Sequence, residues 1–394
     1  MTRTVLLGDV AQVQGGYAFK SGDFIDSGVP VLKIKNVQKG NVSFEEINYV
    51  SEEVANDAKQ WLVQSGDVLI SMTGSGPSQP NSAVGRTAYM KKTDPDALIN
   101  QRIGRLVFKK PVLYSPEFVY YFLSSELVQE YLLNNASGSA NQANISNKLV
   151  ESIKMPEIEL STSRGIAQML SVIDEKIELN RQMNRTLEQI GQALFKHSFI
   201  DNPESKTWPK GKVKGLVDRI NQPLKANGHL SDRIYLPIEK LQMKSLSILD
   251  PLPYTGARSS LIGFEKNDIL VGAMRVYFHR VNIAPSKGVT RTTVFVLRPK
   301  SESLRAYATL LLSQNETVAY ANTHSRGTTM PYAVWDGGLG DMSIVIPSEE
   351  ELRKFNDTTW PLLEKVRDLF KDTKTLVNLR DSLLPRLISG KIKV

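Results

Sequence analysis

Side chains that could contact a nucleic acid recur in several expected loops of this sequence. Lysine and arginine neutralise phosphates, whereas asparagine, glutamine and arginine present hydrogen-bond donors to base edges. Ordinary solvation of a polar loop is the alternative explanation at each position. The candidate DNA-binding residues are Lys33, Lys35, Asn36, Ser75, Gln79, Asn81, Arg86, Arg102, Asn141, Gln142, Asn144, Lys225, Arg233, Arg275, Tyr277, Arg280, Arg326 and Thr328.

The sequence contains no recognisable catalytic motif. The four histidines lie far apart and there is no cysteine, so no metal-binding spacing occurs. Residues 73–86 have a G-x-G beginning at 74–76 but lack the third glycine of a dinucleotide-binding loop and the Gly-Lys-Ser/Thr ending of a P-loop. Residues 174–176 and 372–374 have the D-x-K spelling of some nucleases, yet they fall in amphipathic stretches where solvated charges are common. We therefore predict no catalytic residue, no metal ligand and no cofactor on this chain.

Charge is distributed unevenly along the chain. The formal net charge is +8, of which residues 201–346 carry +7, whereas residues 1–160 carry −2, 161–200 carry +1 and 347–394 carry +2. A basic second half suits a polyanionic partner. Because the sequence has no cysteine and no apolar run of the roughly 18 residues that a membrane span requires, we expect a soluble protein of the reducing cytoplasm.

The chain of 394 residues is long enough for two domains, and it contains an internal repeat. Three short motifs of the first half recur in the second half in the same order. The pairs are SGDVLI at 65–70 with KNDILV at 266–271, SIKMP at 152–156 with SIVIP at 343–347, and TLEQIGQALF at 186–195 with TLVNLRDSLL at 375–384. We therefore expect two diverged copies of one folding unit.

Each half ends in a stretch with helical periodicity. Apolar residues recur every three or four positions from 166 to 194 and from 352 to 387. Because proline is disfavoured inside a helix, the second helix is expected to begin near Pro361 and to end or kink at Pro385. Before each helix, β-branched and aromatic runs alternate with loops rich in glycine and asparagine, which predicts an α+β unit.

Two asparagines interrupt the apolar stripe of the first long helix. Asn180 and Asn184 stand where the spacing of the neighbouring apolar residues expects hydrophobic side chains. Polar residues in a helix seam lower stability and fix the register or the partner. The alternative is that they mark a solvent-facing stretch of the helix.

The ordered set of motifs resembles the specificity subunit of type I restriction-modification systems. The matching pieces are LGDVAQVQGGYAF at 7–19, VPVLKIKNVQKG at 29–40, SGDVLIS at 65–71, VGR at 84–86, NQRI at 100–103, NISNKLVESIKMP at 144–156, IAQMLSVIDEKIELNRQMN at 166–184 and LLPRLISGKIKV at 383–394. Their order and duplication cover nearly the whole chain.

The resemblance implies an α+β fold with two tandem globular α/β target recognition domains. Each domain is expected to be followed by a long helix, and the two helices to form an antiparallel coiled coil. The expected segments are target recognition domain 1 at 1–160, a central spacer helix at 161–200, target recognition domain 2 at 201–346 and a C-terminal spacer helix at 347–394.

The resemblance also implies a non-catalytic subunit in which each domain recognises one half of a split site in double-stranded DNA. The implied partners are two methyltransferase (modification) subunits and restriction or translocase subunits. S-adenosylmethionine and ATP would be bound by those partners, and no membrane is involved. A coiled-coil scaffold that does not bind DNA and, less favoured, a stand-alone nuclease are the alternative functions.

Overall fold

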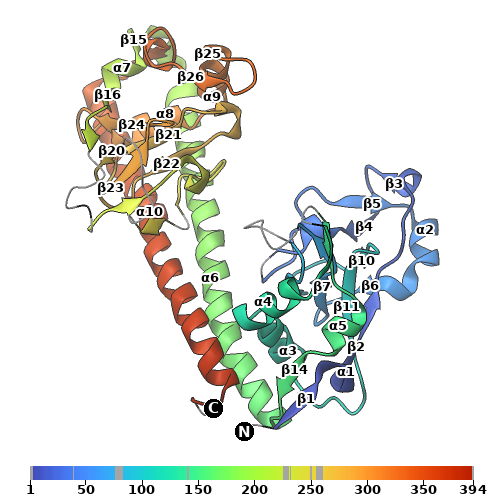
Figure 1. Ribbon diagram of the computed structural model, residues 1–394. Coiled ribbons are helices and arrows are strands. Elements are labelled where there is room, and N and C mark those ends of the chain that lie inside the picture. The colour runs from blue at the N-terminus through green and yellow to red at the C-terminus, as the bar shows by residue number, and fades with distance from the viewer. Residues whose placement is uncertain are drawn as a thin grey trace. The chain divides into compact units, whose positions relative to one another are not determined.

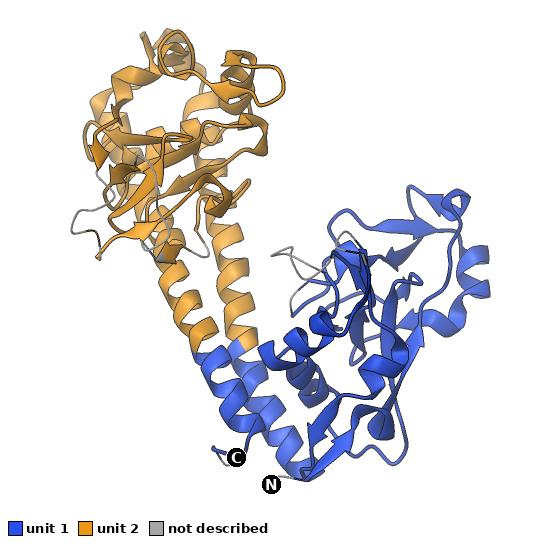
Figure 2. Ribbon diagram, in the orientation of Figure 1, with its two compact units in different colours: residues 1–173, 379–394 blue, residues 174–378 orange. Residues whose placement is uncertain are grey.

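The structure, a computed structural model, divides into two compact units (Figure 2). It describes residues 3–38, 40–75, 83–139, 142–224, 230, 232–248, 251–253 and 261–392 (Figure 1). Unit 1 comprises Met1–Ile173 and Leu379–Val394, and unit 2 comprises Asp174–Asn378. Each unit therefore contains a part of both long helices.

Unit 1 is built on two larger sheets. A four-stranded antiparallel sheet has the order β2-β11-β7-β9, and a five-stranded sheet has the order β3-β5-β4-β10-β6 with β4 and β10 parallel. A small sheet β12-β13-β8 and the pair β1-β14 complete the set. The strands are β1 (Thr4–Leu6), β2 (Ala11–Gly15), β3 (Phe24–Ile25), β4 (Val29–Leu32), β5 (Asn48–Val50), β6 (Leu62–Val63), β7 (Val68–Ser71), β8 (Thr73–Gly74), β9 (Thr87–Tyr89), β10 (Ala97–Ile99), β11 (Ile103–Phe108), β12 (Ser137–Ser139), β13 (Gln142–Asn144) and β14 (Lys154–Pro156).

Unit 2 repeats this plan. Its four-stranded antiparallel sheet has the order β16-β24-β21-β22, and its five-stranded sheet β17-β20-β23-β18-β19 contains one parallel pair, β18 with β23. The pairs β15-β27 and β25-β26 stand beside them. The strands are β15 (Lys210–Lys212), β16 (Val217–Ile220), β17 (Pro223–Leu224), β18 (Ile234–Tyr235), β19 (Leu252–Pro253), β20 (Leu261–Phe264), β21 (Ile269–Gly272), β22 (Val281–Ile283), β23 (Gly288–Arg291), β24 (Val294–Pro299), β25 (Ser325–Arg326), β26 (Tyr332–Ala333) and β27 (Ser343–Val345).

The turn before the central strand confirms the predicted repeat. Asp67 accepts a hydrogen bond from the Gln64 amide at 2.8 Å, and Asp268 accepts one from the Glu265 amide at 2.7 Å. The residue before each aspartate, glycine in unit 1 and Asn267 in unit 2, has a positive φ, which these two residue types tolerate best. The motifs SGDVLI and KNDILV therefore form the same turn and the same buried strand.

Short helices cover the sheets. In both units a helical stretch is divided in two at a serine-containing junction, 124–125 in unit 1 and 313–314 in unit 2, and the serine hydroxyls there bond to carbonyls of the preceding turn. This stretch is therefore a pair of helices in each unit. The short helices are α1 (Leu7–Val10), α2 (Glu52–Asp57), α3 (Pro116–Leu123), α4 (Glu126–Asn134), α5 (Asn147–Glu151), α7 (Val213–Leu216), α8 (Arg305–Leu312) and α9 (Asn315–Thr323).

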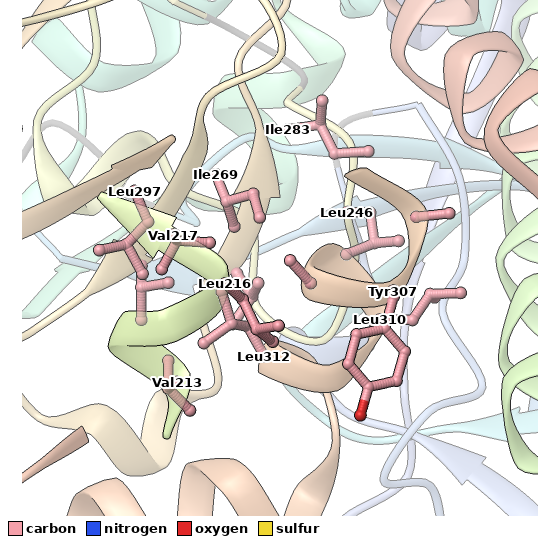
Figure 3. Close-up of a cluster of buried hydrophobic side chains, with 14 of the residues drawn as sticks. Val213, Leu216, Val217, Leu246, Ile269, Ile283, Leu297, Tyr307, Leu310 and Leu312 are labelled. Atoms are coloured by element: carbon pink, nitrogen blue, oxygen red, sulfur yellow. The ribbon is translucent and has the colours of Figure 1, made fainter. Parts of the chain in front are cut away.

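The largest buried cluster of unit 2 lies between the four-stranded sheet and α8. Figure 3 shows Tyr307, Leu310 and Leu312 of α8 beside Ile269 and Leu297 of the sheet, all of which are almost completely buried. Residues of the long helices, including Phe195 and Leu363, belong to the same cluster. Burial of such side chains contributes about 1.5–3 kcal/mol each, so the helices and the sheet of unit 2 share one core.

The long helices are α6 (Leu160–Phe195) and α10 (Glu349–Ile388). In unit 2, Asn180 of α6 contacts Thr373 of α10, whereas Phe195 lies 6.3 Å from Phe355 between ring centroids. Residue numbers thus rise along one helix as they fall along the other, and the helices form the expected antiparallel coiled coil. None of the helices in the described ranges is long and apolar enough to cross a membrane.

The expectation that the second long helix begins near Pro361 is wrong. The helix starts twelve residues earlier, at Glu349. Ser348 and Glu351 form a capping box, in which the Glu351 amide donates to the Ser348 hydroxyl at 3.3 Å and the Ser348 amide donates to the Glu351 carboxylate at 3.2 Å. Pro361 stands inside the helix because the buried neighbours Trp360 and Leu363 hold that turn against the core.

Asn180 and Asn184 are buried in unit 2, as a position in the helix seam requires. Their side chains are 1% and 6% exposed. The Asn180 amide donates to the Thr373 hydroxyl at 3.4 Å, and among the described residues neither asparagine Oδ1 atom accepts a hydrogen bond. A buried acceptor without a partner costs about 1–3 kcal/mol, so these residues lower the stability of the seam.

Replacing both Asn180 and Asn184 with leucine is expected to raise the melting temperature by about 5 °C or more. The apolar side chains fill the seam without an unpaired acceptor, but they no longer mark one register, so hydrogen exchange along α6 should become faster. Gln182→Leu on the exposed side of α6 is the matched control and should leave both quantities unchanged. An unaltered melting temperature in the double variant would show that the asparagine oxygens are satisfied.

Candidate nucleic-acid interface

One backbone position holds together three of the candidate segments of unit 1. Met72 follows β7, and its amide donates to the Arg102 carbonyl at 2.9 Å while its carbonyl accepts from the Ile145 amide at 2.9 Å. The next two residues, forming β8, pair with Ala143 and Asn144 of β13. The segments around 73–75, 100–103 and 142–144 are therefore neighbours.

The same position in unit 2 makes the same bonds. Ala273 follows β21, and its amide donates to the Thr293 carbonyl at 2.8 Å while its carbonyl accepts from the Ala333 amide at 2.7 Å. A bridge between Met274 and Tyr332 corresponds to the pairing of Thr73 with Asn144 in unit 1. We call this arrangement the backbone frame of each unit.

The loop that leaves each frame is closed by a further backbone hydrogen bond. The Ser71 amide donates to the Arg86 carbonyl at 2.8 Å, and the Gly272 amide donates to the Arg280 carbonyl at 2.9 Å. Arg86 and Arg280 therefore occupy equivalent positions in the two units. Sequence reasoning selected both residues without showing that they correspond.

A glycine hairpin completes each frame. Gly138, within β12 and paired with β13, has φ +112°, and Gly327, between β25 and β26, has φ +89°. A Cβ atom at Gly138 would lie 2.2 Å from the Gln142 carbonyl oxygen, and one at Gly327 would lie 3.2 Å from the Met330 carbonyl oxygen. Glycine is therefore required at the first position and strongly favoured at the second.

The predicted residues of unit 1 differ in how much of the side chain is available. Arg102 and Gln142 are exposed beside the frame, and Ser75, Arg86 and Asn144 are half-buried. These five residues belong to the segments that the frame brings together. Gln79, Asn81 and Asn141 lie outside the described residues.

Lys33, Lys35 and Asn36 follow β4 of the other sheet. Lys33 places its Nζ 3.6 Å from the centroid of the Phe24 ring, and burial, followed by the nearby Lys35 charge, lowers its pKa. Lys35 is exposed and pairs with Glu46 at 3.4 Å. Both ammonium groups can still approach a phosphate, because the Lys35 pair is solvated and such pairs are weak.

The selection of Asn36 as a base-reading residue is not supported by its surroundings. Asn36 is 1% exposed. Its Oδ1 accepts from the Lys33 amide at 2.9 Å, and its Nδ2 donates to the Ser43 carbonyl at 2.9 Å. The side chain therefore shapes the loop that carries the two lysines and has no free edge to offer a base.

The predicted arginines of unit 2 also divide into available and engaged side chains. Arg233 is half-buried, with one guanidinium nitrogen 3.5 Å from Glu265 and another 3.3 Å from the Gly288 carbonyl. Arg280 lies over the Phe278 ring at 4.8 Å, and burial lowers its pKa. Arg275, Arg326 and Thr328 are exposed, whereas Lys225 lies outside the described residues.

Left-handed residues that no sequence motif indicates shape the loop after the frame of unit 2. Arg275 and His279 have φ values of 50° and 51° and enclose a short turn that carries Tyr277 at its exposed tip. The Arg275 amide donates to the Pro331 carbonyl at 2.7 Å, and the His279 carbonyl accepts from the Lys244 amide at 2.8 Å. Non-glycine residues in this conformation are strained and recur at functional sites.

The His279 side chain ties this loop to the junction between α8 and α9. Its Nε2–H donates to the Ser313 carbonyl at 2.9 Å. Burial lowers its pKa below the ordinary 6.5, and the nearby Lys244 charge acts in the same direction, while the bond to Ser313 opposes them. The folded chain therefore favours the neutral imidazole.

The described residues contain no group of three or more histidine, cysteine, aspartate or glutamate side chains that could hold a metal ion. Taken together, the two frames and their neighbouring loops offer hydrogen bonding by amides, ion pairing by arginines and lysines, and, in unit 2, apolar contact by Tyr277 and its neighbours. This set is suited to binding a nucleic acid.

Comparisons with known proteins find the same family in the first half of the chain and over nearly its whole length. Residues 2–189 match the family described as the type I restriction modification DNA specificity domain. The type I restriction enzyme MjaIX specificity subunit of Methanocaldococcus jannaschii is 24% identical over 417 residues, covering 98% of this chain and 92% of that subunit. The MjaVIII specificity subunit of the same organism is 29% identical over 194 residues, covering 48% of this chain but only 44% of that subunit.

The fold also matches a solved structure. The S subunit of a type I restriction-modification system from M. genitalium superposes with a TM-score of 0.62 and covers 98% of this chain and 95% of that chain. At 15% sequence identity this likeness shows the fold alone.

Acidification is expected to weaken unit 2 through His279. Because the folded pKa lies below the unfolded value, the unfolded chain takes up a proton first, and stability is lost as the pH falls below about 6.5. His279→Asn keeps a residue that tolerates a left-handed φ but does not titrate. Melting temperatures at about pH 7.5 and about pH 5.5 should fall further in the wild type than in the variant. Equal losses would show that His279 titrates normally in the folded chain.

Proposed function

Since this chain belongs to the specificity subunits of type I restriction enzymes, we propose that it binds double-stranded DNA at a bipartite site, with each unit contacting one half. One observation carries the proposal. The same backbone frame occurs once in each unit, at Met72 and at Ala273, and each frame presents a different set of side chains. Two equivalent frames with different side chains suit two half-sites of different sequence.

Unit 1 supplies amide chemistry for base edges. Gln142 is exposed on β13, and Asn144 stands two residues along the same strand, so both side chains project to one face. Glutamine and asparagine form paired hydrogen bonds with adenine in the major groove. Arg102, which lies next to the frame through its backbone, suits guanine or a phosphate.

Affinity would come mainly from unit 2. Residues 201–346 carry a net charge of +7, whereas residues 1–160 carry −2. Phosphate neutralisation supplies much of the affinity of a protein for DNA and makes it sensitive to salt. Arg275 and Arg326, both exposed next to the second frame, are proposed to neutralise phosphates there.

The partners follow from the family. We propose that this non-catalytic subunit positions two methyltransferase subunits and restriction or translocase subunits on the DNA, and that S-adenosylmethionine and ATP are bound by those partners. The target base would be flipped into a methyltransferase subunit. The coiled coil is proposed to set the spacing of the half-sites. A cytoplasmic location also stays a prediction.

A single substitution should change the preference for one half-site and leave the other intact. Gln142→Ala removes a base contact of unit 1, and a lost paired contact corresponds to about 1–3 kcal/mol, or about 5- to 150-fold in discrimination. Selection from a randomised duplex library by the full chain, with a chelator present, should then show relaxed preference in one half-site. Thr328→Ala, in unit 2, is the matched variant for the other half-site.

Gln142→Ala and Thr328→Ala together test whether each unit contacts one half-site. Relaxation of both half-sites by Gln142→Ala would contradict the assignment of one unit to each half, because distant sites are energetically independent. Selection of no sequence by the wild-type chain would contradict DNA recognition itself.

A further inference from the structure

Exposed apolar side chains gather at one place on unit 2. Among the described residues between 201 and 346, the large hydrophobic side chains that are exposed are Met243, Tyr277, Met330 and Tyr332, at 56%, 51%, 54% and 49%. We call these four residues the apolar patch. Single exposed apolar residues are ordinary, whereas a cluster of them marks a binding surface.

Backbone hydrogen bonds bring the three segments of the patch together. The residue after Met243 donates its amide to the His279 carbonyl at 2.8 Å, so the first segment lies beside the Tyr277 turn. The Arg275 amide donates to the Pro331 carbonyl at 2.7 Å, which places the residue between Met330 and Tyr332 against the same turn. Tyr332 also forms the bridge with Met274.

The turn that presents Tyr277 is held at both ends by backbone hydrogen bonds. Its two left-handed ends are tied to neighbouring segments, Val276 is buried, and Tyr277 meets Phe278 edge to face with ring centroids 4.9 Å apart. Arg280 covers the Phe278 ring and supports it. A rigid aromatic side chain loses little conformational freedom on binding, so the strained turn favours Tyr277 as a contact residue.

Positive charge surrounds the patch. Lys244, Arg275 and Arg326 are exposed, and no ion pair joins any of them to another described residue. The segments 242–247, 274–280 and 323–333 contain no aspartate or glutamate. The surface thus combines apolar contact with charge complementarity to a polyanion, which points to duplex DNA as its occupant.

The equivalent face of unit 1 is chemically different. Tyr332 corresponds by register to Asn144, because each pairs with the second residue after its central strand. The described parts of 72–86 and 136–145 contain no exposed large hydrophobic residue. One frame therefore presents amides and the other presents apolar side chains.

We propose that the apolar patch reads the methyl groups of thymine in the major groove of its half-site. This inference rests on the proposed function and names how unit 2 carries it out. The thymine C5-methyl is the apolar feature of the major groove, and apolar side chains contact it. Burial of one such group corresponds to about 0.8 kcal/mol, or about fourfold in affinity.

Replacement of thymine by deoxyuridine tests the inference, because it removes only the methyl group. The duplex selected from the randomised library by the wild-type full chain is resynthesised with deoxyuridine at one thymine position at a time. The wild-type chain should bind about fourfold more weakly at one or more positions of one half-site. Deoxyuridine in the other half-site, assigned to Gln142, should change affinity much less.

Variants of the patch connect the methyl effect to the protein. Tyr277→Ser and Met330→Ser alter exposed side chains, so both should keep the wild-type melting temperature, and at least one should lose the difference between thymine and deoxyuridine. Tyr277→Phe retains the ring and should retain the difference. Gln142→Ala should also retain it.

The possible negative results distinguish failure of this inference from failure of the proposed function. If no deoxyuridine position weakens wild-type binding, or if both serine variants keep the full difference, the patch does not read thymine methyl groups. Weaker binding to all sequences without any deoxyuridine effect would instead indicate a wedge inserted between base pairs, and would also overturn the inference. Failure of the wild-type chain to select any sequence would be a failure of the proposed function.

Discussion

The geometry of each candidate interface depends on the backbone of one residue at the end of a buried central strand. Met72 and Ala273 both use the amide toward one segment and the carbonyl toward another, at distances of 2.7 to 2.9 Å. Buried backbone groups must find partners in any folded chain, whatever side chain they carry. A frame made of such bonds therefore fixes where three loops meet while leaving their side chains unconstrained.

A second kind of constraint acts where the long helices pack against the rest of unit 2, through buried polar groups. Glu188 of α6 accepts from the Ser245 hydroxyl at 2.8 Å and the Leu246 amide at 3.0 Å, and burial raises its pKa. Arg367 of α10, 3% exposed, bonds to Asn267 in the turn before β21. Apolar contacts tolerate sliding along a helix, whereas these directional bonds hold each helix at one position against unit 2.

Periodicity and repetition made the architecture predictable, because both are local properties of the sequence. The two helices and the two α+β units follow from apolar spacing and from the repeated motifs. The helix-breaking tendency of Pro361 predicts a later start for α10 than the observed one, because burial of Trp360 and Leu363 and the capping box of Ser348 and Glu351 outweigh that tendency. The frame joins residues 30 and 73 positions apart in unit 1 and 20 and 60 positions apart in unit 2, which no local pattern reports.

Residue type alone could not separate binding side chains from supporting ones. The amide that suits Asn36 to a base edge also suits it to closing a turn, and the guanidinium that suits Arg233 and Arg280 to phosphate also suits a carboxylate or a ring. The sequence does not indicate that Arg275 and His279 are left-handed, because a left-handed conformation is expected from sequence mainly at glycine and asparagine. Burial and hydrogen bonding in the folded chain distinguish the side chains available for binding from those that support the fold.

The single hydrogen bond that closes each loop beside the frame has an evolutionary and practical consequence. Fourteen residues separate Ser71 from Arg86, and seven separate Gly272 from Arg280, yet the closing bonds are 2.8 and 2.9 Å. Doubling the length of a flexible loop adds only about 0.6 kcal/mol to its closure. A segment of this kind can be exchanged for another of different length without moving the strands, so insertion, deletion or grafting between the two closing residues is a route to a new preference that leaves the folding unit intact.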